Sequence, residues 1–356
     1  MNTFPAMLPD ENLPHQTPDP NGPAALEPLN PPAVSPADLP ADLSPDSLSD
    51  SIDSAAPSAP LLPEQDLQPQ PSQPLLFQNW EQPLPRPPAR IPHLGHLAIL
   101  GTFALFGLIV ATGAFFLALH FHLYGVQTKE QAIYDIHFTL GHEVLLYLIT
   151  FVASILFFPL VWDRGFFAGI QWNGATAFRL RHRLFLAAIL CFLLALLSTA
   201  LMPGPKDAPI DKMFRSPGAA WLLFGFGVTI APFFEELFFR GFFLPALCTA
   251  CDWVNERIRH TAPPLLGPNG HPQWSLSAMI AGSIFTSLPF AALHAAQTGY
   301  SWGPLLLLVA VSLVLCAVRL VTRSLASSVL VHASYNFLLF SLMLLGSQGF
   351  QHLDKL

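Results

Sequence analysis

Six polar residues stand at fixed spacings inside some of the most apolar stretches of the sequence. They are Glu235, Glu236 and Arg240 in APFFEELFFRGFF, His294 in FAALHAA, and His332 with Asn336 in VHASYNF. A charged side chain at the centre of a membrane costs at least about 2.5 kcal/mol, so such residues pair, line a wet cavity or take part in chemistry. Carboxylates, imidazoles and amides are groups that activate water and stabilise an oxyanion.

Helical geometry separates the roles of the two adjacent glutamates. Residues four apart share one face of a helix, whereas neighbours point about 100° apart. We therefore expect Glu236 and Arg240 to form an intrahelical ion pair that neutralises both charges. Glu235 points elsewhere and lacks this partner, which leaves its carboxylate available as a general base.

The same spacing recurs in the two histidine motifs. His332 and Asn336 lie four residues apart, as do Phe290 and His294. If these faces converge with Glu235, the carboxylate can take a proton from water that His294 helps to hold. His332 and Asn336 can then donate hydrogen bonds to a developing oxyanion.

A metal site is the alternative use of the same residues. Two histidines and one carboxylate can hold zinc with an open position, here Glu235, His294 and His332. With Glu236 held by Arg240, such a site lacks a separate carboxylate as base. We therefore predict no cofactor, while a divalent metal such as zinc, with Glu236 as base and Glu235 as ligand, stays open.

A second zinc-protease pattern fails. His142 and Glu143 begin an HExxH motif, but position 146 is Leu. His142 lies at the end of an apolar run, where solvation at the membrane surface suffices for it. We therefore assign no chemistry to this pair.

The composition indicates a membrane protein. Mean hydropathy is +0.46, and charged residues make up only 11% of the chain, against about a quarter in soluble domains. Apolar runs of about 20 residues can cross a bilayer as helices. The sequence predicts an all-α, polytopic membrane helix bundle of about seven such helices: Leu97–Leu119, Val144–Val161, Leu184–Met202, Trp221–Cys251, Leu276–Ala296, Pro304–Val321 and Leu325–Leu345.

Two segments are less regular. The fourth run is too long for one straight crossing, and Pro232 and Pro245 are expected to kink it or to split it into a partial helix and a span. Residues 165–183 are apolar and aromatic at first and basic at the end, which favours a segment in the membrane interface.

The N-terminal tail has a different composition. From Met1 to Pro85 there is no Lys or Arg but 12 Asp or Glu, and most of the 36 Pro fall in residues 1–92. Low hydrophobicity with unopposed charge predicts disorder. Pro85, Pro88 and Arg90 match a PxxPxR ligand pattern, whose partner the sequence does not identify.

The distribution of basic residues predicts the orientation, because Lys and Arg are retained on the cytoplasmic side. One side of the predicted spans carries Arg86, Arg90, Arg164, Arg179, Arg181, Arg183, Arg257, Arg259, Arg319 and Arg323. The other carries Lys129, Lys206, Lys212, Arg215 and Lys355. We expect a multi-pass protein of the cell membrane with a cytoplasmic N-terminus.

The three motifs together resemble a known family. EExxxR at Glu235, FxxxH at Phe290 and HxxxN at His332 are, in this order, the motifs of the CPBP intramembrane proteases. This family, also called Abi, includes CAAX prenyl endopeptidases and bacteriocin self-immunity proteins. The resemblance implies that Glu235 is the base, that His294 positions the water, and that His332 with Asn336 stabilises the oxyanion.

The resemblance also implies a division of the chain. We predict a tail (1–92), N-terminal transmembrane helices (93–215), a CPBP-like catalytic core (216–346) and a C-terminal tail (347–356). The expected partners are the lipid bilayer and a membrane-associated peptide or protein substrate, and no nucleic acid. Arg240 and Phe290 are expected to support the site structurally. The alternative is a non-proteolytic scaffold or self-immunity protein that keeps the polar cluster as structure.

Overall fold

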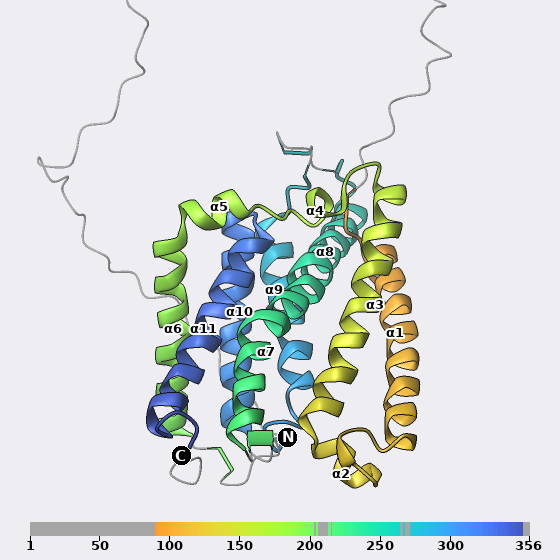
Figure 1. The fold of residues 1–356 in the computed structure, drawn as a ribbon. Coiled ribbons are helices and arrows are strands. Elements are labelled where there is room, and N and C mark those ends of the chain that lie inside the picture. Colours follow the sequence, from red (N-terminus) through yellow and green to blue (C-terminus); the bar gives the residue numbers. More distant parts are fainter. Residues whose placement is uncertain are drawn as a thin grey trace, which may run out of the picture. The chain divides into compact units, whose positions relative to one another are not determined.

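The computed structural model describes residues 90–202, 204–205, 213–214, 216–263, 266–267 and 271–351. The tail predicted to be disordered lies outside this part of the chain, except for its last residues. Within the described residues there are only helices, as predicted, and seven of them are long and apolar enough to cross a membrane. Figure 1 shows these helices as one bundle.

Apart from the C-terminal end of the fourth span, which is Arg259 where Cys251 was predicted, the helix bounds agree with the sequence to within a few residues, with one exception in α3. The long helices are α1 (Leu94–His120), α3 (Ile136–Trp162), α6 (Arg181–Leu201), α7 (Pro217–Glu236), α8 (Leu244–Arg259), α9 (Leu276–Leu293), α10 (Trp302–Thr322) and α11 (Leu325–Gly346). Short elements connect them: η1 (Leu123–Gly125), α2 (Lys129–Tyr134), α4 (Phe166–Gly169) and α5 (Gly174–Arg179).

The fourth span is one continuous helix, which corrects the expected split, and its irregular part lies between the two prolines. A π-helical segment, η3 (Leu237–Phe243), joins α7 to α8, and the three form one 43-residue helix. Pro232 lies inside α7, and Pro245 stands in the first turn of α8, where its missing N–H is tolerated. The helix departs from regular α-helical geometry in η3, the wider π-helical segment that lies between the two prolines.

The exception is the start of α3, eight residues before the predicted one. Asp135 caps the helix, because its Oδ1 accepts hydrogen bonds from the backbone N–H groups of His137 and Phe138. The extra two turns contain His142 and Glu143. These residues therefore lie on a helix inside the bundle and not at its end.

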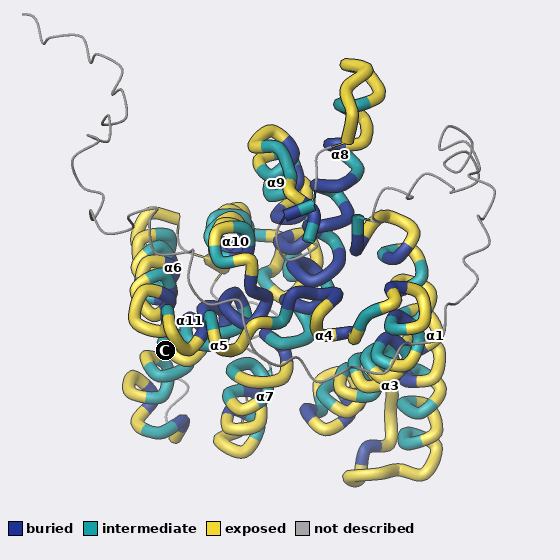
Figure 2. Tube along the Cα trace, turned by 90° about the horizontal axis from the view of Figure 1, so that it is seen from above, coloured by how far each residue is buried: buried dark blue, intermediate teal, exposed yellow. Residues whose placement is uncertain are grey.

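The helices pack closely at small residues and face outward with apolar ones. A Cβ added at Gly282 of α9 would lie 2.6 Å from Cys248 Sγ of α8, so only glycine allows this approach. Figure 2 shows the buried residues gathered around the middle of the bundle and the outer faces of α1, α3 and α6 exposed. Their exposed residues, such as Leu156 and Leu160, are those that lipid would cover.

The segment predicted to lie in the interface reaches into the protein. Ile170 is fully buried, and the carbonyl of Gln171 accepts a hydrogen bond from Leu325 N over 3.0 Å. Leu325, the first residue of α11, is also fully buried and packs with Leu237 and Phe242. The first residue of α11 is thus held against this segment and against η3. The motif of His332 and Asn336, two turns later on α11, therefore lies near η3.

Candidate active site

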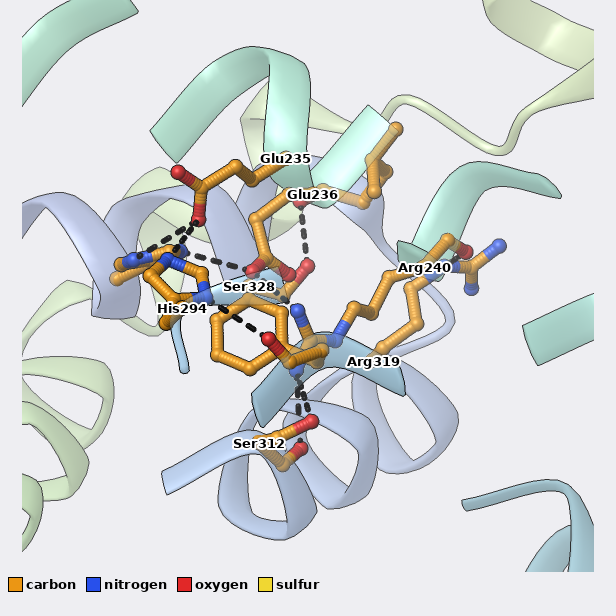
Figure 3. A network of polar contacts seen from close by, with 10 residues as sticks. Glu235, Glu236, Arg240, His294, Ser312, Arg319 and Ser328 are labelled. Atoms are coloured by element: carbon orange, nitrogen blue, oxygen red, sulfur yellow. Dashed lines mark hydrogen bonds and ion pairs between the residues drawn. The ribbon is translucent and has the colours of Figure 1, made fainter. Parts of the chain in front are cut away.

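The motif residues come from four parts of the bundle and meet in one cluster (Figure 3). Glu235 and Glu236 end α7, Arg240 lies in η3, His294 caps α9, and His332 and Asn336 lie on α11. The two glutamate side chains diverge. Figure 3 shows Glu236 directed toward Arg240 and Glu235 directed toward the imidazoles.

Glu236 and Arg240 form the expected ion pair in complete burial. Arg240 Nη1 donates to Glu236 Oε1 over 2.8 Å, and both side chains are 0% exposed. Arg240 Nη2 donates to Ser312 Oγ over 2.7 Å and to the Ser312 carbonyl over 3.1 Å. The ring of Phe290 stands 4.7 Å from the guanidinium, a favourable cation–π contact. The pair therefore ties α7 and η3 to α9 and α10.

Glu236 also orients a histidine of α11. The Nδ1 of His332 lies 2.9 Å from the same Oε1 that accepts from Arg240. Oε1 thus receives an arginine and an imidazole, and Oε2 is buried without a hydrogen-bond partner among the described residues, so neither oxygen of Glu236 borders the cavity. Glu236 is not free to act as the base, which weighs against the arrangement in which Glu235 is a ligand and Glu236 the base.

Glu235 borders a small space shared with both imidazoles. Its Oε2 lies 3.9 Å from His294 Nε2 and 3.8 Å from His332 Nε2, longer than direct hydrogen bonds. Its side chain is 20% exposed, whereas that of Glu236 is 0% exposed. Within the described part of the chain no Lys or Arg pairs with Glu235. It therefore combines partial access to water with an uncompensated charge.

The hydrogen bonds of the two histidines fix their tautomers. His294 Nδ1 lies 2.8 Å from the carbonyl oxygen of Phe290, which can only accept. His332 Nδ1 faces the ionised Glu236 in the same way. Each Nδ1 therefore carries a proton, and in its neutral form each ring presents the lone pair of Nε2 toward Glu235. Two nitrogen acceptors and a carboxylate oxygen thus face one point, which suits a water that donates hydrogen bonds.

Asn336 is held on the same side of the cluster. Its Nδ2 donates to the carbonyl of Gly227 on α7 over 2.7 Å. An amide nitrogen has two N–H donors, so one remains for a substrate atom. The residue lines the same cavity as Glu235, His294 and His332.

Sequence reasoning missed the part played by Arg319, which it counted among the charges at the membrane surface. This side chain of α10 is only 2% exposed. Its Nη1 donates to Gln171 Oε1 over 2.8 Å and its Nη2 to the Ile170 carbonyl over 3.3 Å. Its Nε donates to the Arg240 carbonyl over 3.2 Å. Arg319 therefore connects the segment around Ile170 to the backbone beside the cluster.

The π-helical segment explains why that carbonyl is free. Leu244 N–H bonds to the carbonyl of Phe239, five residues back, and Pro245 has no N–H. Neither can satisfy Arg240 O, so Arg319 does. A signal existed in the sequence, because Arg319 stands in the apolar run VLCAVRLVT. No feature of the sequence identified Ser312 as the partner of Arg240.

A cavity of about 600 Å³ leads to Glu235. It is bordered by α3, α7, α9, α10 and α11, and includes Glu143 and His142 of α3 as well as the motif residues. A second, smaller pocket of about 210 Å³ reaches Glu235 between α1, α3 and the end of α9. Apart from Glu235, Tyr147 and Thr150 its lining is apolar. Glu235 thus stands between a large cavity that contains polar side chains and a small pocket that is almost entirely apolar.

The three residues of the alternative metal site lie farther apart in this arrangement than the ligands of a zinc ion. Neighbouring ligands around a tetrahedral zinc ion are about 3.4 Å apart, for bonds of about 2.0 to 2.1 Å. Glu235 Oε2 is farther than this from both histidine Nε2 atoms. Among the residues that the structure describes, no group of three His, Cys, Asp or Glu side chains is arranged to hold a metal ion.

Comparison with known proteins identifies the region that carries the cluster. Residues 217–338 match the family of type II CAAX prenyl endopeptidases described as Rce1-like. The resemblance predicted from the three motifs is thus confirmed, and the Rce1-like region contains all six motif residues. The matched family is one of proteases, which supports peptidase activity in general. No curated protein and no solved structure matches the chain.

The buried ion pair predicts a large effect of Arg240→Ala on stability. Removal of one partner leaves Glu236 buried and uncompensated, which costs about 3 to 5 kcal/mol. Thermal unfolding in detergent should therefore show a clear loss for Arg240→Ala and little change for Arg181→Ala at the exposed start of α6.

The double variant Glu236→Gln with Arg240→Gln should recover much of this loss, because it strands no charge. A fully stable but inactive Arg240→Ala protein would contradict the structural assignment. Arg240 would then act directly on the substrate.

Proposed function

We propose that the protein is an intramembrane endopeptidase that hydrolyses a peptide bond in a membrane-associated substrate, with Glu235 as the base that activates water. The single observation that carries this proposal is the contrast between adjacent carboxylates. Glu236 is completely buried and bonded to Arg240 and His332, whereas Glu235 is partly exposed to a cavity and faces two Nε2 acceptors. Peptidase activity agrees with the family match over residues 217–338.

The proposed reaction follows from the donors and acceptors of the cluster. Glu235 takes a proton from a water that also donates toward the Nε2 of His294, and the water oxygen attacks the scissile carbonyl carbon. The resulting oxyanion accepts the second N–H of Asn336 and, where His332 has first taken a proton from solvent on Nε2, that Nε2–H as well, the proton returning to solvent after product release. Collapse of this intermediate breaks the C–N bond, and the proton held by Glu235 passes to the leaving amine.

The surroundings of Glu235 favour a substrate that lies partly in lipid. The small pocket beside Glu235 is lined by Leu100, Ala104 and Leu293 among others, and offers room for an apolar side chain. The larger cavity on the other side contains the polar groups. A peptide that crosses from one to the other would place its backbone next to Glu235.

Glu235→Gln tests the role of the base. The amide keeps the shape and hydrogen-bonding capacity but cannot take a proton, so the rate of reporter-peptide cleavage should fall by about 10²-fold or more. Glu130→Gln, an exposed change on α2, is the matched control and should cleave like the unmodified protein. Purified proteins in detergent, checked for equal melting temperatures, give the comparison.

Equal cleavage rates for Glu235→Gln and the unmodified protein would end the catalytic proposal. If neither cleaves any membrane peptide while a cellular phenotype of the protein survives the Glu235→Gln change, the cluster has a structural role. The protein is then a non-proteolytic scaffold or self-immunity protein.

We also propose that no tightly bound metal is required. A metal ligated by Glu235 would leave the site without a base, because Glu236 is committed to Arg240 and His332. Elemental analysis of active protein should find less than stoichiometric zinc, and chelator treatment should leave cleavage intact. The proposal is contradicted if the protein contains stoichiometric zinc, loses activity on chelation and regains it when zinc is added back.

A further inference from the structure

A second carboxylate faces the cavity from outside the matched family region. Glu143 lies on α3, in the two turns that precede the predicted span, and lines the 600 Å³ cavity together with Glu235. It is partly exposed there. The proposed hydrolysis gives it no role, and the match over residues 217–338 does not include it.

The direction of Glu143 follows from its neighbours on α3. His142 turns toward α1, where its Nε2 lies 3.2 Å from Thr112 Oγ1. Adjacent residues on a helix point about 100° apart, so Glu143 faces α7 and the cavity. Tyr147, one turn later, stacks on Phe234 of α7 with ring centroids 4.7 Å apart. This contact fixes the face of α3 that carries Glu143.

Glu143 has little local compensation for its charge. Among the described residues its hydrogen-bond partner is Tyr147, whose hydroxyl donates over a long 3.4 Å. Glu143 and Glu235 line the same cavity, where their like charges repel each other. A positive charge placed in the cavity between them would relieve this repulsion.

Among the residues that the structure describes, the cavity lining offers no such charge. Its ionisable side chains are Glu143, Glu235, His142, His294, His332 and Tyr335, with no Lys or Arg. Arg240 stands behind this lining, completely buried and bonded to Glu236 and Ser312. Both histidines of the cluster present acceptor atoms to the space in their neutral forms. The cavity is therefore rich in acceptors and poor in cations.

We propose that Glu143 is a specificity-determining residue that selects substrates with a Lys or Arg side chain next to the scissile bond. The inference rests on the proposed function. A cationic side chain complements Glu143, whereas an acidic side chain or a free C-terminal carboxylate in the same place meets two like charges. The cavity volume is ample for one such side chain.

A matched peptide series tests this selection. The peptides carry Lys, norleucine or Glu at each of the two positions on either side of the scissile bond and are otherwise identical. For at least one position we expect kcat/KM to favour Lys over norleucine by about 10- to 100-fold, the range for one charge-assisted contact. In Glu143→Gln this ratio should fall to within about threefold of one. Glu143→Arg should favour the Glu peptide.

The control is Glu130→Gln, which removes an equal charge from exposed helix α2 and should keep the ratio of the unmodified protein. A Lys preference that persists in Glu143→Gln, or no preference in the unmodified protein, overturns the inference. Melting temperatures in detergent show whether each variant is folded.

Binding separates this inference from the proposed function. Peptides with an N-methylated scissile bond are not cleaved, and fluorescence anisotropy gives their Kd for the unmodified protein and Glu143→Gln. If nothing is hydrolysed but the Lys peptide binds more tightly in a Glu143-dependent way, the proposed function fails and the cavity assignment stands. Equal Kd values for the Lys and norleucine peptides overturn the assignment, whatever the activity.

Discussion

The buried ion pair of Glu236 and Arg240 is the interaction on which the remaining geometry depends. Two charges sit at 0% exposure in an apolar bundle, where each alone would be prohibitively unstable. Each therefore recruits further partners: Ser312 of α10 for the guanidinium and His332 of α11 for the carboxylate. Helices that are remote in sequence are held together because a buried charge requires hydrogen bonds.

Because buried charges require partners, the adjacent residues Glu235 and Glu236 have different roles. The carboxylate of Glu236 is bonded to Arg240 and His332 and holds these side chains in place. Glu235 points about 100° away from Glu236 around the helix axis, so it does not pair with Arg240. Its carboxylate borders the cavity, and no Lys or Arg among the described residues pairs with it. The tautomers of His294 and His332, set by the Phe290 carbonyl and by Glu236, turn acceptors toward the same point. The ion pair of Glu236 and Arg240 thus fixes the surroundings of the adjacent Glu235.

The sequence was sufficient for features that depend on local periodicity. Apolar length predicted the seven spans, and the i, i+4 spacing predicted the Glu236 and Arg240 contact. It was insufficient where tertiary contacts decide. The π-helical turn before Pro245 leaves a carbonyl that Arg319 satisfies across the bundle, and no local rule anticipates this. Glu143 was assigned no chemistry because it stood outside the apolar run, whereas an aspartate cap starts α3 two turns before that run. The predicted domain boundaries and membrane orientation stay predictions.

The central claim is that Glu236 holds His332 through Nδ1, so that both Nε2 atoms face Glu235. Nitrogen-15 NMR of protein labelled at histidine tests it most directly, with His294 and His332 assigned through His→Gln variants. For the neutral form of both rings the account predicts a protonated Nδ1 and an unprotonated Nε2, and it predicts a changed His332 spectrum in Glu236→Gln. A His332 ring with its proton on Nε2, or a spectrum indifferent to Glu236→Gln, would contradict it.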